Sequence, residues 1–437
     1  MPVELTTAAA DFEAAFTRML SAKREDSTDV SDTVAAIIAD VRARGDAAVI
    51  DYTTRFDKLP LTADTLRFSK AEIAAHTAKV SAEDRAALEL AAERIRAYHA
   101  RQMPADESWS DDAGATLGWR WGAVSAAGLY VPGGQASYPS SVLMNAVPAR
   151  VAGVGRLVVC VPTPRGEVNP LVLLACELAG VDEIYRIGGA QAIAALAYGT
   201  DTIAPVDKIT GPGNAYVAAA KRQVFGKVGI DMIAGPSEVL IIADGDQNPD
   251  WLALDLMAQA EHDADAQSIL ITPDPAMARA VAASVEALIP TLSRAEIAAA
   301  SWRDYGTIIV TRDLDEAAAL SDRVAPEHLE LFVADPEALA EKTHHAGAIF
   351  LGAFTPEAVG DYVSGPNHVL PTARSARFSS GLSVMDFLKR TTMARLTPAA
   401  LAAIGPSAVR LAESEGLQAH GRSVSARLAA LNDRSGA

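Results

Sequence analysis

A glutamate and a histidine stand side by side in this sequence, at Glu327 and His328. Histidine titrates near neutral pH and suits a general base, and burial can raise the pKa of a glutamate towards the same range. In a strand these neighbours would point to opposite faces, so a turn or a helix start after Pro326 is needed to bring them together. The pair is a candidate for proton transfer, although adjacent Glu and His residues also have structural roles.

A second candidate lies at the end of the helical run that starts near Trp251. Gln259 and His262 are three positions apart, so their side chains share one face of a helix. An amide oxygen and an imidazole nitrogen could then approach one metal ion. Helix ends commonly have polar residues, and glutamine is an uncommon zinc ligand, so the pair alone leaves a structural role open.

The segment GDYVSGPNH, residues 360–368, has two glycines and a proline and predicts a loop that contains Asp361 and His368. Polar loops held by α/β scaffolds are favoured positions for ligands. His420 also stands in a polar context, near the C-terminus. The remaining histidines are expected to be structural: His76, His99, His344 and His345.

Two glycine-rich runs, GGAQ (188–191) and GPGN (211–214), each follow a predicted strand. Such turns can place backbone N–H groups against a ligand. Neither completes the GxGxxG pattern, because Tyr216 stands at the sixth position counted from Gly211. The runs therefore predict ligand contact without specifying a nucleotide.

The elements that must position these residues alternate between short apolar runs and Ala-rich helical segments. The predicted strands are 126–130, 157–161, 183–187, 208–210, 230–233, 239–243, 269–272, 307–311, 331–333 and 348–351. Strands spaced by helices predict βαβ units and parallel sheets. The expected fold is α/β, with two Rossmann-like α/β domains with parallel sheets, an N-terminal helical arm and a small C-terminal helical domain.

Helices are expected before the first of these strands. Residues 11–20 predict a short arm. A second helix is expected to be capped by Ser31 or Asp32 and to end at Gly45, and a third covers about 82–101. The apolar face of the second helix is Val34, Ile37, Ile38 and Val41.

The predicted division of the chain has four parts. They are the helical arm at 1–24, a discontinuous first α/β domain at 25–129 and 239–381, a second α/β domain at 130–238, and a C-terminal tail at 382–437. Predicted strands stop after about residue 382, so the tail is expected to be helical. Because it is too small to have a core of its own easily, we expect it to dock on a second subunit.

The composition is that of a globular protein: half of the 437 residues are hydrophobic and 5% are aromatic. A net charge of −17 without a visible basic patch argues against nucleic-acid binding. No apolar stretch could span a bilayer and no signal peptide is visible, so we expect a cytoplasmic protein without membrane contact. Cys160 and Cys176 lie in apolar runs and are expected to be buried thiols rather than disulfide or zinc cysteines.

Taken together, these segments resemble the histidinol dehydrogenase family over nearly the whole chain. The resemblance rests on LYVPGG (129–134), GGAQA (188–192), TGPGN (210–214), AGPSE (234–238), QAEHD (259–263), APEHLE (325–330), SGPNHVLPT (364–372) and EGLQAH (415–420). It implies a zinc-containing, NAD-dependent oxidoreductase of histidine biosynthesis.

The resemblance also implies roles for individual residues. One zinc ion per subunit would be bound by Gln259, His262, Asp361 and His420, with the last supplied across a homodimer with shared active sites. L-Histidinol would be held by Ser237, His328, His368 and Glu415, together with the zinc and its ligands. NAD would lie near Tyr130, Gln191 and Asn214.

The implied reaction is two oxidations in one site, from L-histidinol to L-histidinal to L-histidine, each passing a hydride to NAD⁺. His328 would remove the alcohol proton and act again in the second oxidation, while Glu327 would activate the water that hydrates the aldehyde. Zinc would mainly orient the imidazole and the amino group of the substrate.

Three alternatives stay open. A dehydrogenase of the same family could act on another polar alcohol, such as a sulfonated diol, but a sulfonate calls for added Arg or Lys, whereas Glu415 and His368 suit a cationic imidazole substrate. A zinc hydrolase with Glu327 as base gives no role to the glycine-rich turns. A non-catalytic, zinc-stabilised binding protein needs no paired acid and base.

Overall fold

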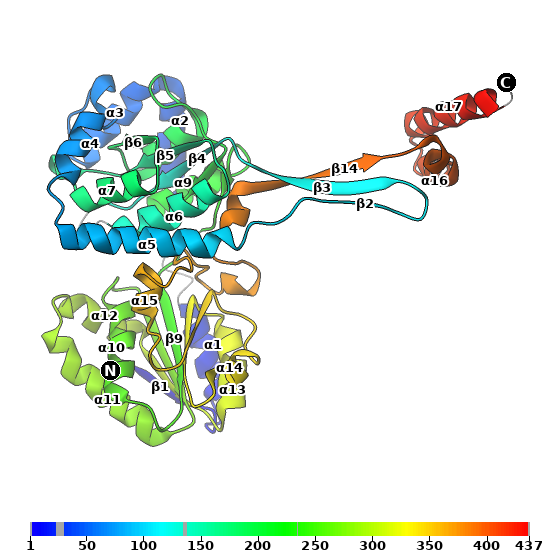
Figure 1. Cartoon of the computed structure of the whole chain (residues 1–437). Coiled ribbons are helices and arrows are strands. Elements are labelled where there is room, and N and C mark those ends of the chain that lie inside the picture. Colours follow the sequence, from blue (N-terminus) through cyan, green and yellow to red (C-terminus); the bar gives the residue numbers. More distant parts are fainter. Residues whose placement is uncertain (1, 23–29, 134–137, 234, 436–437) are drawn as a thin grey trace. The chain divides into compact units, whose positions relative to one another are not determined.

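The computed structural model describes residues 2–22, 30–133, 138–233 and 235–435. The chain forms two compact units, one of 1–102 with 124–387 and one of 103–123 with 388–437. No helix among the described residues is long and apolar enough to cross a membrane. The larger unit contains two parallel sheets with helices on their faces, which confirms the predicted α/β class (Figure 1).

One sheet of the larger unit has six parallel strands in the order β1-β11-β10-β9-β12-β13. They are β1 (Val3–Thr6), β9 (Glu238–Ala243), β10 (Gln267–Thr272), β11 (Thr307–Val310), β12 (His328–Phe332) and β13 (Ala348–Leu351). Strands β9, β10 and β12 are buried along their whole length, which explains the continuous apolar runs within β9 and β10. Strand β12 begins at His328, three residues before the predicted 331–333. Helices cover both faces.

The helices of this half divide between two hydrophobic cores. They are α1 (Phe12–Ala22), α10 (Pro249–Ala260), α11 (Pro275–Leu288), α12 (Ala295–Tyr305), α13 (Leu314–Val324), α14 (Pro336–Ala340) and α15 (Glu357–Tyr362). Helices α10, α11 and α12 pack on one face of the sheet through Leu252, Val281 and Trp302. Helices α1, α13 and α14 pack on the other, where Phe16 and Leu240 belong to one hydrophobic core.

The second sheet has five parallel strands in the order β6-β5-β4-β7-β8. They are β4 (Ala126–Tyr130), β5 (Arg156–Cys160), β6 (Glu183–Tyr185), β7 (Lys208–Thr210) and β8 (Gly229–Ile230). Its first strand, β4, lies between β5 and β7, just as β9 lies between β10 and β12 in the other sheet. In both sheets the strand order therefore reverses beside an inner strand, β4 or β9, as it does in Rossmann-type sheets.

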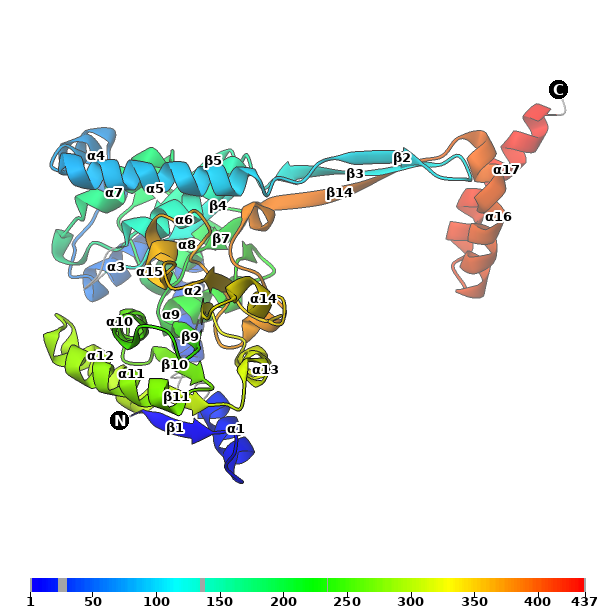
Figure 2. The same ribbon diagram turned by 60° about the horizontal axis from the view of Figure 1, so that its bottom comes forward.

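The four helices that follow α1 belong to this second half (Figure 2). They are α2 (Ser31–Arg44), α3 (Asp46–Phe56), α4 (Lys70–Thr77) and α5 (Ala82–Ala100), which join α6 (Pro139–Val151), α7 (Pro170–Leu178), α8 (Gly189–Tyr198) and α9 (Ala215–Val224). The apolar face predicted for α2 is buried in one core with β4, α8 and α9. The predicted division instead grouped 25–129 with 239–381, because chain order does not show which sheet a helix covers.

The ends of α2 agree only in part with the predicted signals. Gly45 follows the helix at a φ of 56°, as expected for its end. The N-cap, however, is Val30, without a side-chain cap, so the prediction that Ser31 or Asp32 caps the helix is wrong. The predicted boundary between the arm and the first domain, at residues 24 and 25, lies outside the described residues.

The smaller unit is not purely helical, which corrects the prediction that strands stop after residue 382. It contains a three-stranded antiparallel sheet of β2 (Glu107–Ser110), β3 (Thr116–Ala123) and β14 (Leu388–Arg395), followed by α16 (Pro398–Ser414) and α17 (Gln418–Ser435). Strand β14 has four consecutive polar residues, at 389–392, and its residues are almost all exposed, so it lacked the apolar signal by which the buried strands were recognised.

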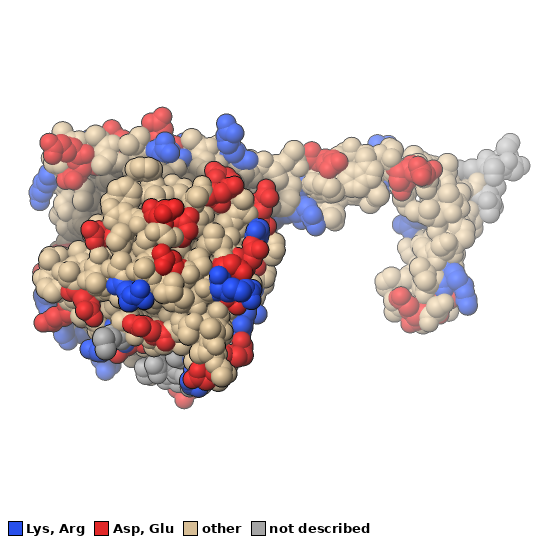
Figure 3. Space-filling model, turned by 90° about the horizontal axis from the view of Figure 1, so that it is seen from below, with Lys and Arg blue, Asp and Glu red and all other residues tan. Residues whose placement is uncertain are grey.

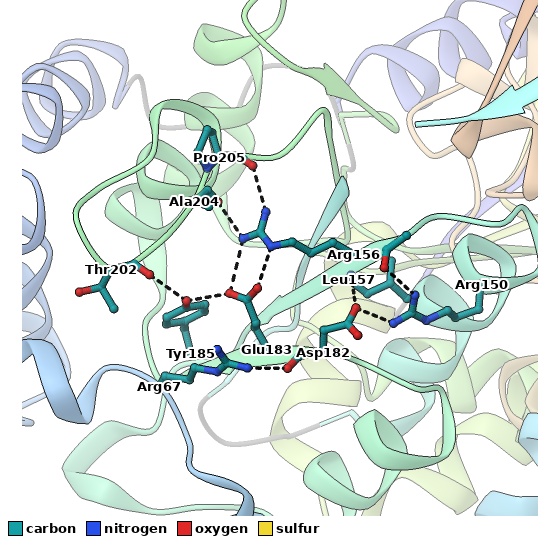
Figure 4. A network of polar contacts seen from close by, with 11 residues as sticks. Arg67, Arg150, Arg156, Leu157, Asp182, Glu183, Tyr185, Thr202, Ala204 and Pro205 are labelled. Carbon is teal, nitrogen blue, oxygen red and sulfur yellow. Dashed lines mark hydrogen bonds and ion pairs between the residues drawn. The ribbon is translucent and has the colours of Figure 1, made fainter. Parts of the chain in front are cut away.

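A network of polar contacts connects strands at the amino edge of the five-stranded sheet (Figure 4). Arg156, which opens β5, donates to Glu183, which opens β6, at 2.7 Å between Nε and Oε1. The Tyr185 hydroxyl donates to the same carboxylate, at 2.8 Å. These bonds join β5 to β6 at the amino edge of the sheet. The two glycine-rich turns lie at the opposite, carboxyl edge.

Candidate active site

The predicted catalytic residues lie at the amino edge of the six-stranded sheet. His328 opens β12, with Glu327 just before it, and Ser237 directly precedes β9. Gln259 and His262 lie at the end of α10, on the way to β10. Because parallel strands begin at the same edge, segments far apart in sequence meet here.

Glu327 and His328 converge on the backbone of Glu238. The Glu327 Oε2 accepts from the Glu238 N–H at 2.9 Å, and the His328 Nδ1 lies 2.9 Å from the Glu238 carbonyl oxygen. The chain turns just before Pro326, and not after it as the sequence predicted, because Ala325 ends the helix α13 with a left-handed φ of 50°. Both side chains are buried, with exposed fractions of 6% and 4%.

This geometry fixes the state of the His328 ring. A carbonyl oxygen can only accept, so Nδ1 carries the hydrogen and Nε2 keeps a free lone pair. Burial lowers the pKa of His328, against the opposing charge of Asp361. The Nε2 atom is buried, has no hydrogen-bond partner in the described chain, and lies 4.0 Å from the Asp361 Oδ1. His328 is thus a neutral imidazole with its basic atom available.

Asp361 and His368 are brought together, but not on one loop as predicted. Asp361 lies in α15, because residues after Pro356 continue as a helix to Tyr362. The His368 Nδ1 donates to the Asp361 carbonyl oxygen at 3.0 Å, and burial lowers the pKa of this histidine. Its Nε2 faces the Ser141 hydroxyl of α6, at 3.4 Å.

The loop before His368 is held by buried polar contacts. Asn367 donates through its Nδ2 to the Met144 carbonyl oxygen at 2.5 Å, and the same atom lies 3.4 Å from Nε2 of His99. His99 is fully buried in α5, and its Nδ1 faces Gln102 at 2.6 Å. His99 therefore has the structural role expected of it, because it helps to hold Asn367 and so the loop before His368 in place.

Gln259 and His262 share one side of the end of α10, as their spacing predicted. The Gln259 Nε2 lies 3.2 Å from the His262 Nδ1. The other amide atom, Oε1, is buried without a hydrogen-bond partner among the described residues. An unpartnered oxygen of this kind is costly unless something else binds it, and it suits a metal ligand. His262 also lies close enough to His328 and His368 to lower the pKa of each.

Sequence reasoning missed one acidic residue at the centre of this site. Glu357 is the first residue of α15, and its Oε1 lies 3.6 Å from the His328 Nδ1. His328, Glu357 and Asp361 each offer an atom within 4.8 Å of the others, a grouping that could hold a cation. The sequence pattern that could have revealed Glu357 is its spacing of four residues from Asp361, which places both side chains on one helix face.

The residues predicted to contact NAD lie at the carboxyl edge of the five-stranded sheet. Tyr130 ends β4, Gln191 lies in the first turn of α8, and Asn214 caps α9 by accepting from two backbone N–H groups. The Tyr130 hydroxyl accepts from the Gly189 N–H at 3.1 Å. Dinucleotides bind Rossmann-type sheets at this edge, where the strand order reverses.

Gly211 brings the two strands on either side of that reversal into close contact. Its φ is 108°, and a Cβ added to it would lie 2.1 Å from the Tyr130 carbonyl oxygen, so only glycine fits. A buried ion pair holds the turn: Lys221 contacts Asp231, the Lys221 Nζ donates to the Gly211 carbonyl oxygen at 2.9 Å, and Asp231 accepts the Gly211 N–H at 2.8 Å.

Replacing Lys221 by methionine is expected to destabilise the larger unit by about 3–5 kcal/mol, because Asp231 keeps a buried charge without its partner. Urea unfolding measures this, with Lys227→Met, an exposed lysine of the same segment, as the control. Equal unfolding midpoints for the two variants would show that the pair contributes nothing to stability.

Two predicted site residues belong to the smaller unit. Glu415 follows α16 at its C-terminal cap, and His420 lies in the first turn of α17. Two residues of the recognised motifs, Gly134 and Ala234, lie outside the described residues. The thiols of Cys160 and Cys176 are both buried and free, as expected.

The surface charge gives no sign of a polyanion site on the face that Figure 3 shows. Lys and Arg side chains are interspersed there with Asp and Glu rather than gathered into one patch. This agrees with the chain's overall acidity, with 55 acidic against 38 basic residues. A small-molecule substrate fits the buried polar cluster better than a nucleic acid does.

Known proteins match the chain over its whole length. The family model described as histidinol dehydrogenase matches residues 20–428. Curated histidinol dehydrogenases of Cereibacter sphaeroides and Ruegeria pomeroyi are 75% and 73% identical, over 99% of this chain and 100% of each relative. The crystal structure of histidinol dehydrogenase from Elizabethkingia anophelis superposes with a TM-score of 0.94 at 38% identity, covering 99% of both chains. This chain therefore belongs to the histidinol dehydrogenase family of oxidoreductases.

Proposed function

We propose that this protein oxidises L-histidinol to L-histidinal and then to L-histidine, with NAD⁺ as the hydride acceptor in each step. The observation that supports it best is the buried, neutral His328, whose Nε2 is free beside Asp361 and whose neighbour is Glu327. Each oxidation needs a base, and the second also needs water. The balanced reaction consumes one histidinol, two NAD⁺ and one water, and yields histidine, two NADH and three protons.

His328 acts on the alcohol in this proposal. Its Nε2 takes the hydroxyl proton as hydride leaves the carbon, while the Glu238 carbonyl oxygen holds Nδ1–H and stabilises the protonated ring. Glu327 then takes a proton from the water that adds to the aldehyde, while the protonated His328 returns its proton to the carbonyl oxygen and becomes neutral again. The resulting hydrate gives its hydroxyl proton to His328 as the second hydride leaves.

The residues present fit a zinc ion. Gln259 Oε1 is buried without a hydrogen-bond partner among the described residues, the His262 Nδ1 lies 3.2 Å from the Gln259 Nε2, and Asp361 faces His328. We propose these three as ligands of one zinc per subunit, completed by His420 of the partner subunit. Zinc would act as a Lewis acid that orients the imidazole and amino groups of the substrate. Ser237, His328, His368 and Glu415 complete the proposed substrate site.

The nucleotide site is proposed at the carboxyl edge of the five-stranded sheet. Tyr130, Gln191 and Asn214 lie there, around the reversal of strand order beside β4. Burial raises the pKa of Tyr130 to about 12, so its hydroxyl stays neutral. When bound, NAD⁺ would supply the oxidising power for both steps. The Ser141 to His368 contact joins this edge to the proposed substrate site.

The smaller unit supports a homodimer in this proposal. It presents a three-stranded sheet that is almost fully exposed on β2 and β14, followed by two helices. A second subunit is the expected cover for such an element, and it would place Glu415 and His420 in a shared site. The cytoplasmic location expected from the sequence stays a prediction.

One assay tests the function directly. The purified, zinc-loaded protein is mixed with NAD⁺ and L-histidinol, and NADH is followed by absorbance, with a sulfonated diol as the alternative substrate. We expect two NADH per histidinol and none from the diol. Absence of NADH from histidinol would contradict the proposal, and NADH from the diol alone would favour the other family activity.

Replacing His420 by alanine is expected to weaken zinc retention by about 10-fold or more, because one ligand in the tetrahedral set is lost. Metal content after dialysis measures this, with His76→Ala as a histidine control outside the ligand set. Wild-type zinc content in the His420 variant would remove this residue from the proposed ligands.

A further inference from the structure

Two segments of the chain meet at the amino end of β9, beside the proposed acid and base. One is 235–238, which contains Ser237, and the other is 370–374, which follows closely after His368. They are distant in sequence and are joined by hydrogen bonds. Because Ser237 and His368 are proposed substrate contacts, whatever joins the two segments also helps to fix these side chains relative to each other.

Two hydrogen bonds join the segments, and each runs from the backbone of one to a side chain of the other. The Gly235 N–H donates to the Thr372 hydroxyl oxygen at 2.6 Å. In the opposite direction, the Ala373 N–H donates to the Glu238 Oε1 at 2.9 Å. The side chains that accept these bonds belong to residues that are each only 3% exposed, so water has little access to them. We call this reciprocal pair of bonds the clamp.

The clamp holds a turn that residues other than glycine rarely adopt. Ala373 and Arg374 follow each other in the left-handed region, at φ values of 52° and 63°. In this region the Cβ crowds the following carbonyl oxygen, so two such residues in a row persist only where neighbouring contacts hold them. The Glu238 side chain provides such a contact at the first of the two.

Glu238 also orients the acid and the base, through its backbone. Its N–H donates to the Glu327 Oε2 and its carbonyl oxygen accepts from the His328 Nδ1, each at 2.9 Å. The pairing of β9 with β12 begins only at Val239, opposite His328. On this side of β9 the backbone groups of Glu238 are therefore bound by the two proposed catalytic side chains. A shift of this one residue would displace both side chains.

The second segment lies against the backbone of the acid as well. A Cβ added to Gly347 would lie 2.5 Å from the Glu327 carbonyl oxygen, 3.2 Å from the Leu370 Cβ and 3.1 Å from the Pro371 Cδ. These three groups therefore surround one point just before β13. The segment that the clamp fixes is in this way packed beside the turn that leads into β12.

We propose that Glu238 is a positioning residue, whose side chain, together with Thr372, holds its own backbone in the place that orients Glu327 and His328. No step of the proposed mechanism uses the Glu238 side chain, and it is none of the proposed metal, substrate or nucleotide contacts. The inference rests on the proposed function, which gives Glu327 and His328 their roles in proton transfer.

Two substitutions of Glu238 test this role in the full-length, zinc-loaded enzyme. Glu238→Met has a similar volume but no acceptor for the Ala373 N–H, and kcat is expected to fall by about 10–100-fold with histidinol and with histidinal. Glu238→Gln keeps an acceptor oxygen and should restore kcat to near the wild-type value. The KM for NAD⁺ should stay unchanged in both, because the proposed nucleotide contacts lie on the other sheet. Glu337→Met and Glu337→Gln are the controls at an exposed glutamate.

Thr372 offers a second pair of variants on the other bond of the clamp. Thr372→Val keeps the shape but loses the acceptor for the Gly235 N–H, and kcat is expected to fall in the same way. Thr372→Ser keeps the hydroxyl and should resemble the wild type. This pair decides the question if Glu238→Met does not fold.

Amide hydrogen exchange of the metal-free protein tests the clamp without any turnover. The Ala373 amide is expected to exchange faster in Glu238→Met, and the Gly235 amide in Thr372→Val. The Glu238 amide, which Glu327 accepts, should exchange faster in both. These amides should stay protected in Glu238→Gln and Thr372→Ser.

The outcomes separate this inference from the proposed function. A wild type that forms no NADH from histidinol would overturn the proposed function, and with it the catalytic consequence of the clamp. If the wild type were active and the folded Met and Val variants kept its kcat, the positioning role alone would be overturned. Equal losses in the conservative variants, Glu238→Gln and Thr372→Ser, would overturn it too, as would an unchanged exchange rate of the Glu238 amide.

Discussion

Replacing His328 by asparagine is expected to lower kcat for histidinol oxidation by about 10²–10⁴-fold. The asparagine Nδ2 can still donate to the Glu238 carbonyl oxygen, so the local backbone contact is preserved while the basic Nε2 is lost. A steady-state assay with histidinol, and separately with histidinal, measures the change. Both oxidations should be affected, because each has a hydroxyl proton to remove.

The pH profile provides an internal check on this role. Burial lowers the pKa of His328, so the neutral form should persist below the ordinary value of 6.5. The wild-type rate should therefore fall only when pH drops through that lowered pKa, and this limb should disappear in the variant. His344→Asn, an exposed histidine, is the control. A His328 variant with wild-type kcat would show that another group removes the proton.

The sequence was sufficient to predict the strands and helices that are buried. Strands β9 and β10 contain continuous apolar runs, and α2 has a clean apolar face, so these patterns predicted the correct elements. Strand β12 was predicted only at 331–333, because the polar residues His328 and Glu330 interrupt its apolar pattern. The adjacent Glu327 and His328 and the spacing of Gln259 and His262 were visible for the same local reason. A local sequence pattern shows which residues of a single helix or strand share a face.

What the sequence could not reveal depends on contacts between distant elements. Glu330 and Glu357 are 27 residues apart and meet only because α15 packs beside β12. Strand β1 could be recognised only through its pairing with β11, some 300 residues later in the chain. The exposed strand β14 has no apolar face of its own. None of these features has a periodic signal in its own segment.

The two sheets use opposite edges for the proposed chemistry. Nucleotide contacts are proposed at the carboxyl edge of the five-stranded sheet, where Rossmann-type folds bind dinucleotides. His328 instead opens β12, with Glu327 just before it, at the amino edge of the six-stranded sheet, beside Ser237, which directly precedes β9. Ser141, near the start of α6, contacts His368, so these two edges meet. A hydride can pass from the substrate to the nucleotide only where these two sheet edges meet.

Replacing Glu327 by glutamine is expected to slow histidinal oxidation by about 10²–10⁴-fold while leaving the alcohol step nearly unchanged. Glutamine keeps an oxygen for the Glu238 N–H, which Glu327 accepts at 2.9 Å, so His328 should stay in place. The amide cannot take a proton from water, and the aldehyde must be hydrated before its second hydride can leave. The second NADH of each turnover should therefore appear late.

Stopped-flow absorbance resolves this delay, and histidinal supplied directly isolates the second step. Histidinol should then give a fast phase of one NADH per site, followed by a slow phase, instead of two NADH at one rate. Glu341→Gln, an exposed glutamate on the same half of the protein, controls for the loss of one charge. Unchanged histidinal oxidation in Glu327→Gln would assign water activation to another group, with Glu357, 3.6 Å from the His328 Nδ1, as the nearest acid to test next.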